Sequence, residues 1–287
     1  MNHSSFRYLI IITSCFILLT GCGFKFAYRN LDFIIPWYVD DFVDLDNQQS
    51  SMLEQIIVKH VNWHSKNQLP KYVQLLEDIE SQVDSQLTQK DFETLIHKVQ
   101  SIYREMLYQL HTDIAKMMVS FSDKQIQEVF SEFEKRNKKF KKEYVEPSNE
   151  EFYAERYKKM NDAFREWFRY STKEQKAVLK EWAHALPRNG QVRSEFHQQW
   201  QNQLKINLET VTSTDDKTNA IRSTLDLISK GGNSEVKTAS NRNVSIAIHY
   251  AEVLWPTLEP KQLVRLKDKL SDVKDDLQDL VDYRLFL

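Results

Sequence analysis

Glycine is scarce in this chain of 287 residues, which has only five of them. In an average protein about 7% of residues are glycine. Turn-rich β architectures and phosphate-binding loops both depend on this residue, because it adopts left-handed backbone conformations freely. The shortage argues against both, and no Gly-x-Ser-x-Gly nucleophile elbow is present in the sequence.

Cysteine is scarcer still, with Cys15 and Cys22 as the two copies. Cys15 lies in an N-terminal apolar stretch that we expect to be removed, so one thiol would remain and no disulfide could form within the chain. Stability must then come from a hydrophobic core. A chain of this length can bury one.

An excess of either charge is also absent. There are 39 Lys and Arg residues against 41 Asp and Glu residues, for a net charge of −2. Nucleic-acid binding depends on a basic surface that displaces counterions from phosphates. We therefore expect no nucleic-acid partner, and no motif indicates a small-molecule substrate.

Apolar residues at helical spacing are abundant. Between Thr88 and Phe121 the apolar positions step by three and four, as on one face of a long helix. Similar patterns recur along the chain, no strand-like alternation of useful length interrupts them, and residues 233–243 look like a polar loop. The sequence predicts an all-α fold, an elongated bundle of about nine to eleven helices without a sheet. Five tryptophans are expected at or near its core: Trp63, Trp167, Trp182, Trp200 and Trp255.

The N-terminus carries a targeting signal. Arg7 precedes an apolar run from Leu9 to Leu19, which is shorter than the roughly 20 residues that span a bilayer. The lipobox follows as Leu19, Thr20, Gly21 and Cys22. Its resemblance to bacterial lipoprotein signals implies cleavage before Cys22 and covalent lipid on that residue, with no other cofactor. The alternative is an ordinary signal peptide or an uncleaved helix in which Cys22 is incidental.

This signal divides the chain. We expect residues 1–21 to be a removed signal peptide, 22–30 a lipid-anchored tether and 31–287 a single α-helical periplasmic domain. Gly23 stands where an Asp would resemble an inner-membrane retention signal, so the expected location is the periplasmic side of the outer membrane. Several acyl chains would hold the protein there, since each buried methylene contributes about 0.8 kcal/mol.

Four helix starts share a pattern in which an apolar residue precedes a polar cap. They are Leu87-Thr88-Gln89-Lys90-Asp91, Phe121-Ser122-Asp123-Lys124-Gln125, Tyr170-Ser171-Thr172-Lys173-Glu174-Gln175 and Leu258-Glu259-Pro260-Lys261-Gln262. The pattern predicts capping boxes with hydrophobic staples. It also resembles the Leu-Thr-x-x-Gln signature of Spy and CpxP type periplasmic chaperones, although those proteins are smaller and typically unlipidated.

The densest aromatic and acidic segment runs from Leu31 to Tyr72. It contains Trp37-Tyr38-Val39-Asp40-Asp41-Phe42, then Asp44, Trp63-His64 and Leu69-Pro70-Lys71-Tyr72. Together with the lipobox, these motifs resemble a Gram-negative lipoprotein family catalogued as domain of unknown function 6279. The resemblance implies an α-helical outer-membrane lipoprotein and no activity. The candidate interaction surface is Trp37, Tyr38, Asp40, Asp41, Asp44, Trp63, His64 and Tyr72.

Three chemical alternatives accompany this surface. His60 and His64 lie one helical turn apart, a spacing that suits two metal ligands, but Val61 stands where a zincin needs Glu. Asp40 and Asp44 at i and i+4 could act as paired carboxylates in glycan cleavage. The basic run 134–142 could contact anionic lipid. We expect instead a non-catalytic interaction or assembly protein with an envelope protein partner, or a chaperone-like binder of client chains.

Overall fold

The structure is a computed structural model that describes residues 22–286. Within that range every regular element is helical, which confirms the predicted all-α class. The α-helices are α2 (Cys22–Arg29), α3 (Leu31–Asp40), α4 (Asn47–Asn67), α5 (Leu69–Gln82), α6 (Gln89–Val119), α7 (Asp123–Tyr144), α8 (Asn149–Phe168), α9 (Lys173–Ala185), α10 (Gly190–Thr210), α11 (Thr214–Ser229), α12 (Ser234–Leu254) and α13 (Pro260–Gln278), and a short 3-10 helix, η1 (Trp255–Thr257), precedes α13. None of these helices is both long and apolar enough to span a membrane.

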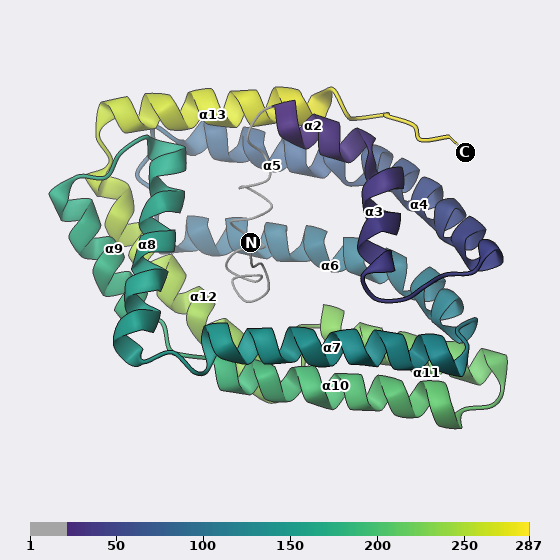
Figure 1. Cartoon of the computed structure of the whole chain (residues 1–287). Coiled ribbons are helices and arrows are strands. Elements are labelled where there is room, and N and C mark those ends of the chain that lie inside the picture. Colours follow the sequence, from purple (N-terminus) through teal and green to yellow (C-terminus); the bar gives the residue numbers. More distant parts are fainter. Residues whose placement is uncertain (1–21, 287) are drawn as a thin grey trace.

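The helices form a frame around α6 (Figure 1). Helices α13 and α5 run together along one edge, and α7 and α10 run together along the opposite edge. Helices α8 and α9 close one end of the frame, whereas α3 and α4 close the other. The C-terminus lies at the end that holds α2, α3 and α4.

Three hydrophobic clusters stabilise this frame. The first joins α2, α4, α5 and α13 around fully buried residues such as Leu69 and Leu270. The second joins α6, α7, α10 and α11 around Ala115 and Ile221, and the third joins α8, α9 and the end of α12. Trp167 and Trp255 pack against the first cluster, Trp200 against the second and Trp182 against the third, as expected. Trp63 is half-buried and belongs to none of them.

All four expected capping boxes are present. Their N-cap residues are Thr88, Ser122, Thr172 and Glu259. Two further capping boxes begin α4 at Asp46 and α8 at Ser148. In each box the side chain at the third helical position accepts a hydrogen bond from the backbone N–H of the N-cap residue. Local sequence therefore determines where these helices begin.

Two pairs of these helix starts meet through buried glutamines. The Nε2 group of Gln49 donates to Oε1 of Gln125 at 3.1 Å, and the reverse bond measures 2.5 Å. Gln175 and Gln262 make the same reciprocal pair at 2.8 and 3.0 Å. Each amide also donates to a backbone carbonyl two residues before its partner's N-cap: Ser120, Asp44, Thr257 and Tyr170. Helix α4 is thereby joined to α7, and α9 to α13.

The structure differs from the sequence prediction in three segments. Residues 22–29 form α2 in place of the expected tether, because Tyr28 finds a buried site in the first cluster. Residues 234–243 are the first half of α12 and not a loop, because Asn233 caps the helix and Val236 is buried. Helix α3 includes Pro36 and ends at Asp40, so Asp40 and Asp44 do not share a helix face.

Candidate functional site

Helix α2 is fixed to the body of the protein from its first turns. Tyr28 is 6% exposed within the first cluster. The ammonium of Lys25 lies 2.9 Å from carboxylate oxygens of both Asp276, on α13, and Asp279, which caps the C-terminus of α13. Hydrogen bonds to these two carboxylates raise the pKa of Lys25. The segment after residue 22 is therefore a docked helix and not a flexible linker.

Three exposed aromatic side chains follow on α2 and α3. Phe26 is 69% exposed, Phe33 74% and Trp37 64%. Phe33 and Trp37 are one turn apart and so lie on the same face of α3. We call Phe26, Phe33 and Trp37 the aromatic face. Exposed aromatic residues are unusual on a soluble protein when they gather in one place, and such patches mark interaction surfaces.

The C-terminal end of α3 is held by Arg136 of α7. Its guanidinium lies 4.1 Å from the ring centre of Phe42, donates to the hydroxyl of Tyr38 at 3.1 Å and lies 3.5 Å from Asp41. Carboxylates such as Asp40 and Asp41 are unfavourable at the C-terminus of a helix because of the helix dipole. Arg136 offsets this cost. It comes from the basic run 134–142, and sequence alone did not connect that run with the acidic segment.

The acidic residues at this end face solvent. Asp40, Asp41 and Asp44 are all exposed. The backbone of Asp44 is fixed to α7, since its N–H donates to Glu128 and its carbonyl accepts from Gln125. The carboxylate of Asp44 is thus presented from a rigid turn between α3 and α4.

His64 lies inside the protein, next to Tyr28 and Tyr72. Its Nδ1 is 3.0 Å from the hydroxyl of Tyr28, and its Nε2 is 3.4 Å from that of Tyr72. Burial lowers the pKa of His64 to about 4. The imidazole is therefore neutral at pH 7, with one ring nitrogen as a donor and the other as an acceptor. Both ring nitrogens of this half-buried side chain thus face tyrosine hydroxyls.

His60 is oriented toward a different helix. Its Nε2 lies 2.7 Å from the carboxylate of Asp113 on α6, which also pairs with Lys59 at 2.6 Å. Burial works against ionisation of Asp113, but the hydrogen bonds from Lys59 and His60 outweigh it and lower the pKa of Asp113. His60 and His64 thus have separate partners. Among residues 22–286, no group of three His, Cys, Asp or Glu side chains could hold a metal ion.

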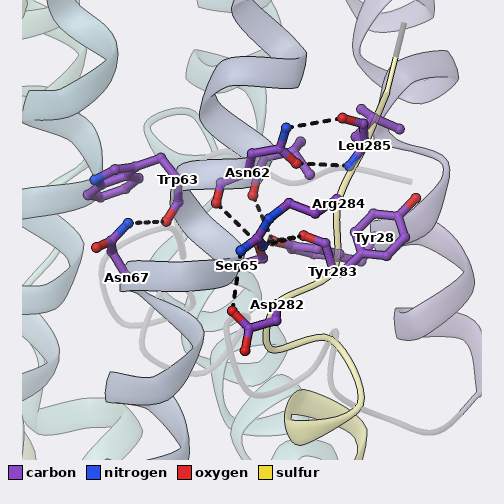
Figure 2. A network of polar contacts seen from close by, with 10 residues as sticks. Tyr28, Asn62, Trp63, Ser65, Asn67, Asp282, Tyr283, Arg284 and Leu285 are labelled. Carbon is purple, nitrogen blue, oxygen red and sulfur yellow. Dashed lines mark hydrogen bonds and ion pairs between the residues drawn. The ribbon is translucent and has the colours of Figure 1, made fainter.

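The C-terminal tail crosses α4 next to this region (Figure 2). The side chain of Asn62 makes two hydrogen bonds to the backbone of Leu285, at 3.0 and 2.8 Å. Ser65 donates to the carbonyl of Tyr283 at 2.7 Å and accepts from Arg284 at 3.1 Å. The hydroxyl of Tyr283 reaches the carbonyl of Arg29 at the end of α2 at 3.2 Å. The two ends of the described chain are therefore packed together.

A cavity of about 600 Å³ lies at the other end of the frame, where α7, α8, the loop after α9, the start of α10 and the first half of α12 meet. Phe152 and Val236 contribute apolar walls, and Lys159 pairs with Glu143 at its edge at 3.4 Å. Oδ1 of Asn243 is buried there without a hydrogen-bond partner among residues 22–286. Volumes of 300–1,000 Å³ are typical of ligand sites.

Arg156 forms part of the cavity wall and has a structural role. Its guanidinium donates to the carbonyls of Ala183, Leu186 and Pro187, which end α9 and begin the following loop. Burial lowers the pKa of Arg156 to about 10, so it stays charged at pH 7. No sequence motif indicates this cavity, because its walls come from three separate stretches of the chain, residues 140–159, 186–193 and 236–243.

The structure separates the predicted interaction surface into two groups. Trp37, Tyr38, Asp40, Asp41 and Asp44 are exposed at α3 and its following turn. Trp63, His64 and Tyr72 are half-buried residues of α4 and α5, and His64 and Tyr72 contact each other. Leu19, Thr20 and Gly21 of the lipobox lie outside the described residues, and Cys22 is the first residue of α2.

Comparison with known proteins gives one family. The model of a family of unknown function, DUF6279, matches residues 41–225. This match covers helices α4 to α10 in full and most of α11. No curated protein and no solved structure matches the chain.

Proposed function

Because the chain belongs to the DUF6279 family, whose function is unknown, we propose from its residues that it is a non-catalytic, lipid-anchored interaction protein of the Gram-negative outer membrane. Cys22 would carry the lipid, and the protein would face the periplasm and bind an envelope protein. Gly23, in place of an Asp, favours the outer membrane over the inner one.

The observation that carries this proposal is the docking of α2. Helix α2 begins at Cys22, and Lys25 and Tyr28 attach it to α13 and to the first cluster. A lipid on Cys22 would therefore hold α3 and its acidic turn close to the membrane, where an envelope protein could contact Tyr38, Asp41 and Asp44.

Replacement of Cys22 tests the anchor. We expect Cys22→Ala to leave the membrane fraction or to remain unprocessed, while Cys15→Ala, which lies before the cleavage site, stays processed and membrane-bound. Mass spectrometry of the purified protein should find the acyl chains on Cys22. An unchanged mass and location for Cys22→Ala would refute the proposal.

Crosslinking in intact cells tests the interaction. A photoreactive residue at position 44, on the exposed turn, should capture one protein in constant stoichiometry from solubilised outer membrane. The same residue at position 216, which is also exposed and lies on α11 on another side of the frame, serves as the matched control. Equal capture at both positions, or none at 44, would remove the acidic turn as the binding surface.

Client binding in the manner of a stress chaperone is a second candidate, and the cavity beside Asn243 favours it. Apolar walls next to paired charges suit an unfolded segment, and the buried Oδ1 of Asn243 could accept from a peptide N–H. We would measure how well the protein prevents a reduced, unfolded client from aggregating. Val236→Glu should weaken this effect, whereas Val264→Glu, at an exposed position on α13, should retain it. Equal suppression by both variants would exclude the cavity.

A further inference from the structure

We propose that the aromatic face, Phe26, Phe33 and Trp37, inserts into the phospholipid leaflet that holds the anchor, so that the protein lies on the membrane in one fixed orientation. This inference rests on the proposed lipid at Cys22. It adds a second membrane contact, made by side chains of the folded protein.

The exposure of these residues is the first observation. Phe26, Phe33 and Trp37 are each more than 60% exposed, although α2 and α3 also carry residues that pack inward, such as Tyr28 and Ile35. The two helices thus have an apolar side toward the core and an aromatic side toward the outside. Helices that lie in a membrane interface bury their aromatic and apolar side chains about 5–10 Å into the lipid.

The short distance to the anchor is the second observation. Position 22 and Tyr28 are six residues apart in one helix, which corresponds to about 9 Å at 1.5 Å per residue. Since Tyr28 is in the core and Lys25 pairs with α13, the body cannot move away from a lipid at position 22 without breaking these contacts. Phe26 follows the anchor position by one turn and must lie near the same surface.

The C-terminal tail provides a third observation. Tyr283 is bonded to the carbonyl of Arg29 at the end of α2, and Phe286, three residues later, is 81% exposed. Both ends of the described chain thus bring an exposed aromatic residue to one end of the frame (Figure 1).

The charge of this surface identifies the lipid chemistry. Arg29 and Asp32 are both exposed beside the aromatic face, and Asp40 is exposed at the end of α3, so this surface has no basic patch. A surface without a basic patch suits lipid headgroups that are mostly zwitterionic, with aromatic rings at the headgroup level. Contact should therefore depend little on salt, unlike attachment through a basic patch.

Fluorescence quenching by lipid tests this contact. The full-length protein, purified from membranes, would carry Phe33→Cys with an attached fluorophore and be incorporated into preformed vesicles of phosphatidylethanolamine and phosphatidylglycerol with nitroxide-labelled lipid. We expect quenching at position 33 to be several times that at the matched site Ile206→Cys, which is 51% exposed on α10 at the opposite edge of the frame. Trp37→Cys should behave like position 33, and 0.5 M salt should not change the ratio.

Each outcome bears on a different claim. Vesicle flotation with equal quenching at positions 33 and 206 would overturn the aromatic contact and leave the anchor in place. Failure of the unlabelled protein to float would overturn the anchor and this inference with it. Circular dichroism of each labelled variant verifies the fold, which surface positions such as 33 and 206 should not disturb.

Discussion

Single buried amides connect distant helix starts in this protein. In the pair of Gln175 and Gln262, each Oε1 accepts from the N-cap backbone of its own helix and from the partner amide, and each Nε2 donates to the partner and to a carbonyl. Every polar atom of the pair is thus satisfied, although both side chains are fully buried. One residue contributes to local capping and to tertiary packing together.

Replacing one of these glutamines should be costly. In Gln175→Ala, the amide of Gln262 loses its two bonds to Gln175 and keeps those to Tyr170 and Glu259, the carbonyl of Thr257 loses its bond to Gln175, and the capping box of α9 is lost. We expect the free energy of unfolding to fall by about 2–4 kcal/mol, as measured by urea denaturation. The control Gln191→Ala, at an exposed position on α10, should change it by less than about 0.5 kcal/mol. Similar small losses in both variants would contradict this role.

His64 should make stability depend on pH. Because burial lowers its pKa from 6.5 to about 4, the unfolded chain binds a proton below pH 6.5 that the folded protein does not bind. The stability from the neutral imidazole is complete above pH 6.5 and is lost as the pH falls toward 4, at up to about 1.4 kcal/mol per pH unit. Urea denaturation between pH 7 and 4.5 should show a smaller decrease for His64→Gln than for the parent protein.

The matched control for this measurement is His97→Gln, since His97 is exposed on α6. Its substitution should leave the pH dependence of the parent protein intact. If His64→Gln kept the full pH dependence as well, protonation of His64 could not be its cause.

At the scale of helices, Arg136 helps to attach α3. No residue of α3 is fully buried, although Leu31, Ile35 and Val39 pack against the first cluster, so contacts at the end of the helix add to its attachment. Arg136→Ala removes the contact with Phe42 and the bonds to Tyr38 and Asp41, which should lower the free energy of local opening by about 1 kcal/mol. Hydrogen exchange should accelerate over residues 31–43. Lys135→Ala, whose side chain is 72% exposed, should leave that exchange unchanged.

Sequence predicted helices best where periodicity and caps agree. The long helix expected between Thr88 and Phe121 is observed as α6, because Thr88 caps it and apolar residues recur at helical spacing. The first half of α12 was missed, since Val236 is its only buried residue before Ala247 and a polar helix has no periodic signal. Likewise, three of the expected helix starts carry Gln at the third helical position. The pairing of these glutamines across the molecule could not be predicted, because it depends on tertiary contacts.

In the candidate site, too, local sequence patterns were predictive and tertiary contacts were not. The aromatic and acidic residues of the segment Leu31–Tyr72 could be singled out from composition alone. Their separation into an exposed group at α3 and a half-buried group at His64 could not, because it depends on α2 packing over α4. Arg136 and the cavity beside Asn243 are likewise assembled from segments distant in sequence.

At the scale of the molecule, the three clusters are linked by few residues. Phe121, between α6 and α7, packs against both the first and the second cluster, and Phe168 packs against both the first and the third. Cooperative unfolding of the frame should therefore depend on such shared residues, together with the glutamine pairs. A frame of separate cores is otherwise able to open in parts.

Phe121→Ala tests this dependence. Loss of the ring should uncouple the two clusters, so that α7, α10 and α11 open at a lower urea concentration than α4, α5 and α13, and each transition should have a smaller m value than the parent protein. Hydrogen exchange at increasing urea concentrations would follow both groups of helices. Phe130→Ala is the matched control, because Phe130 packs against the second cluster and not the first. It should lower stability while the helices still unfold together, and coincident transitions in Phe121→Ala would show that the clusters are joined by other contacts.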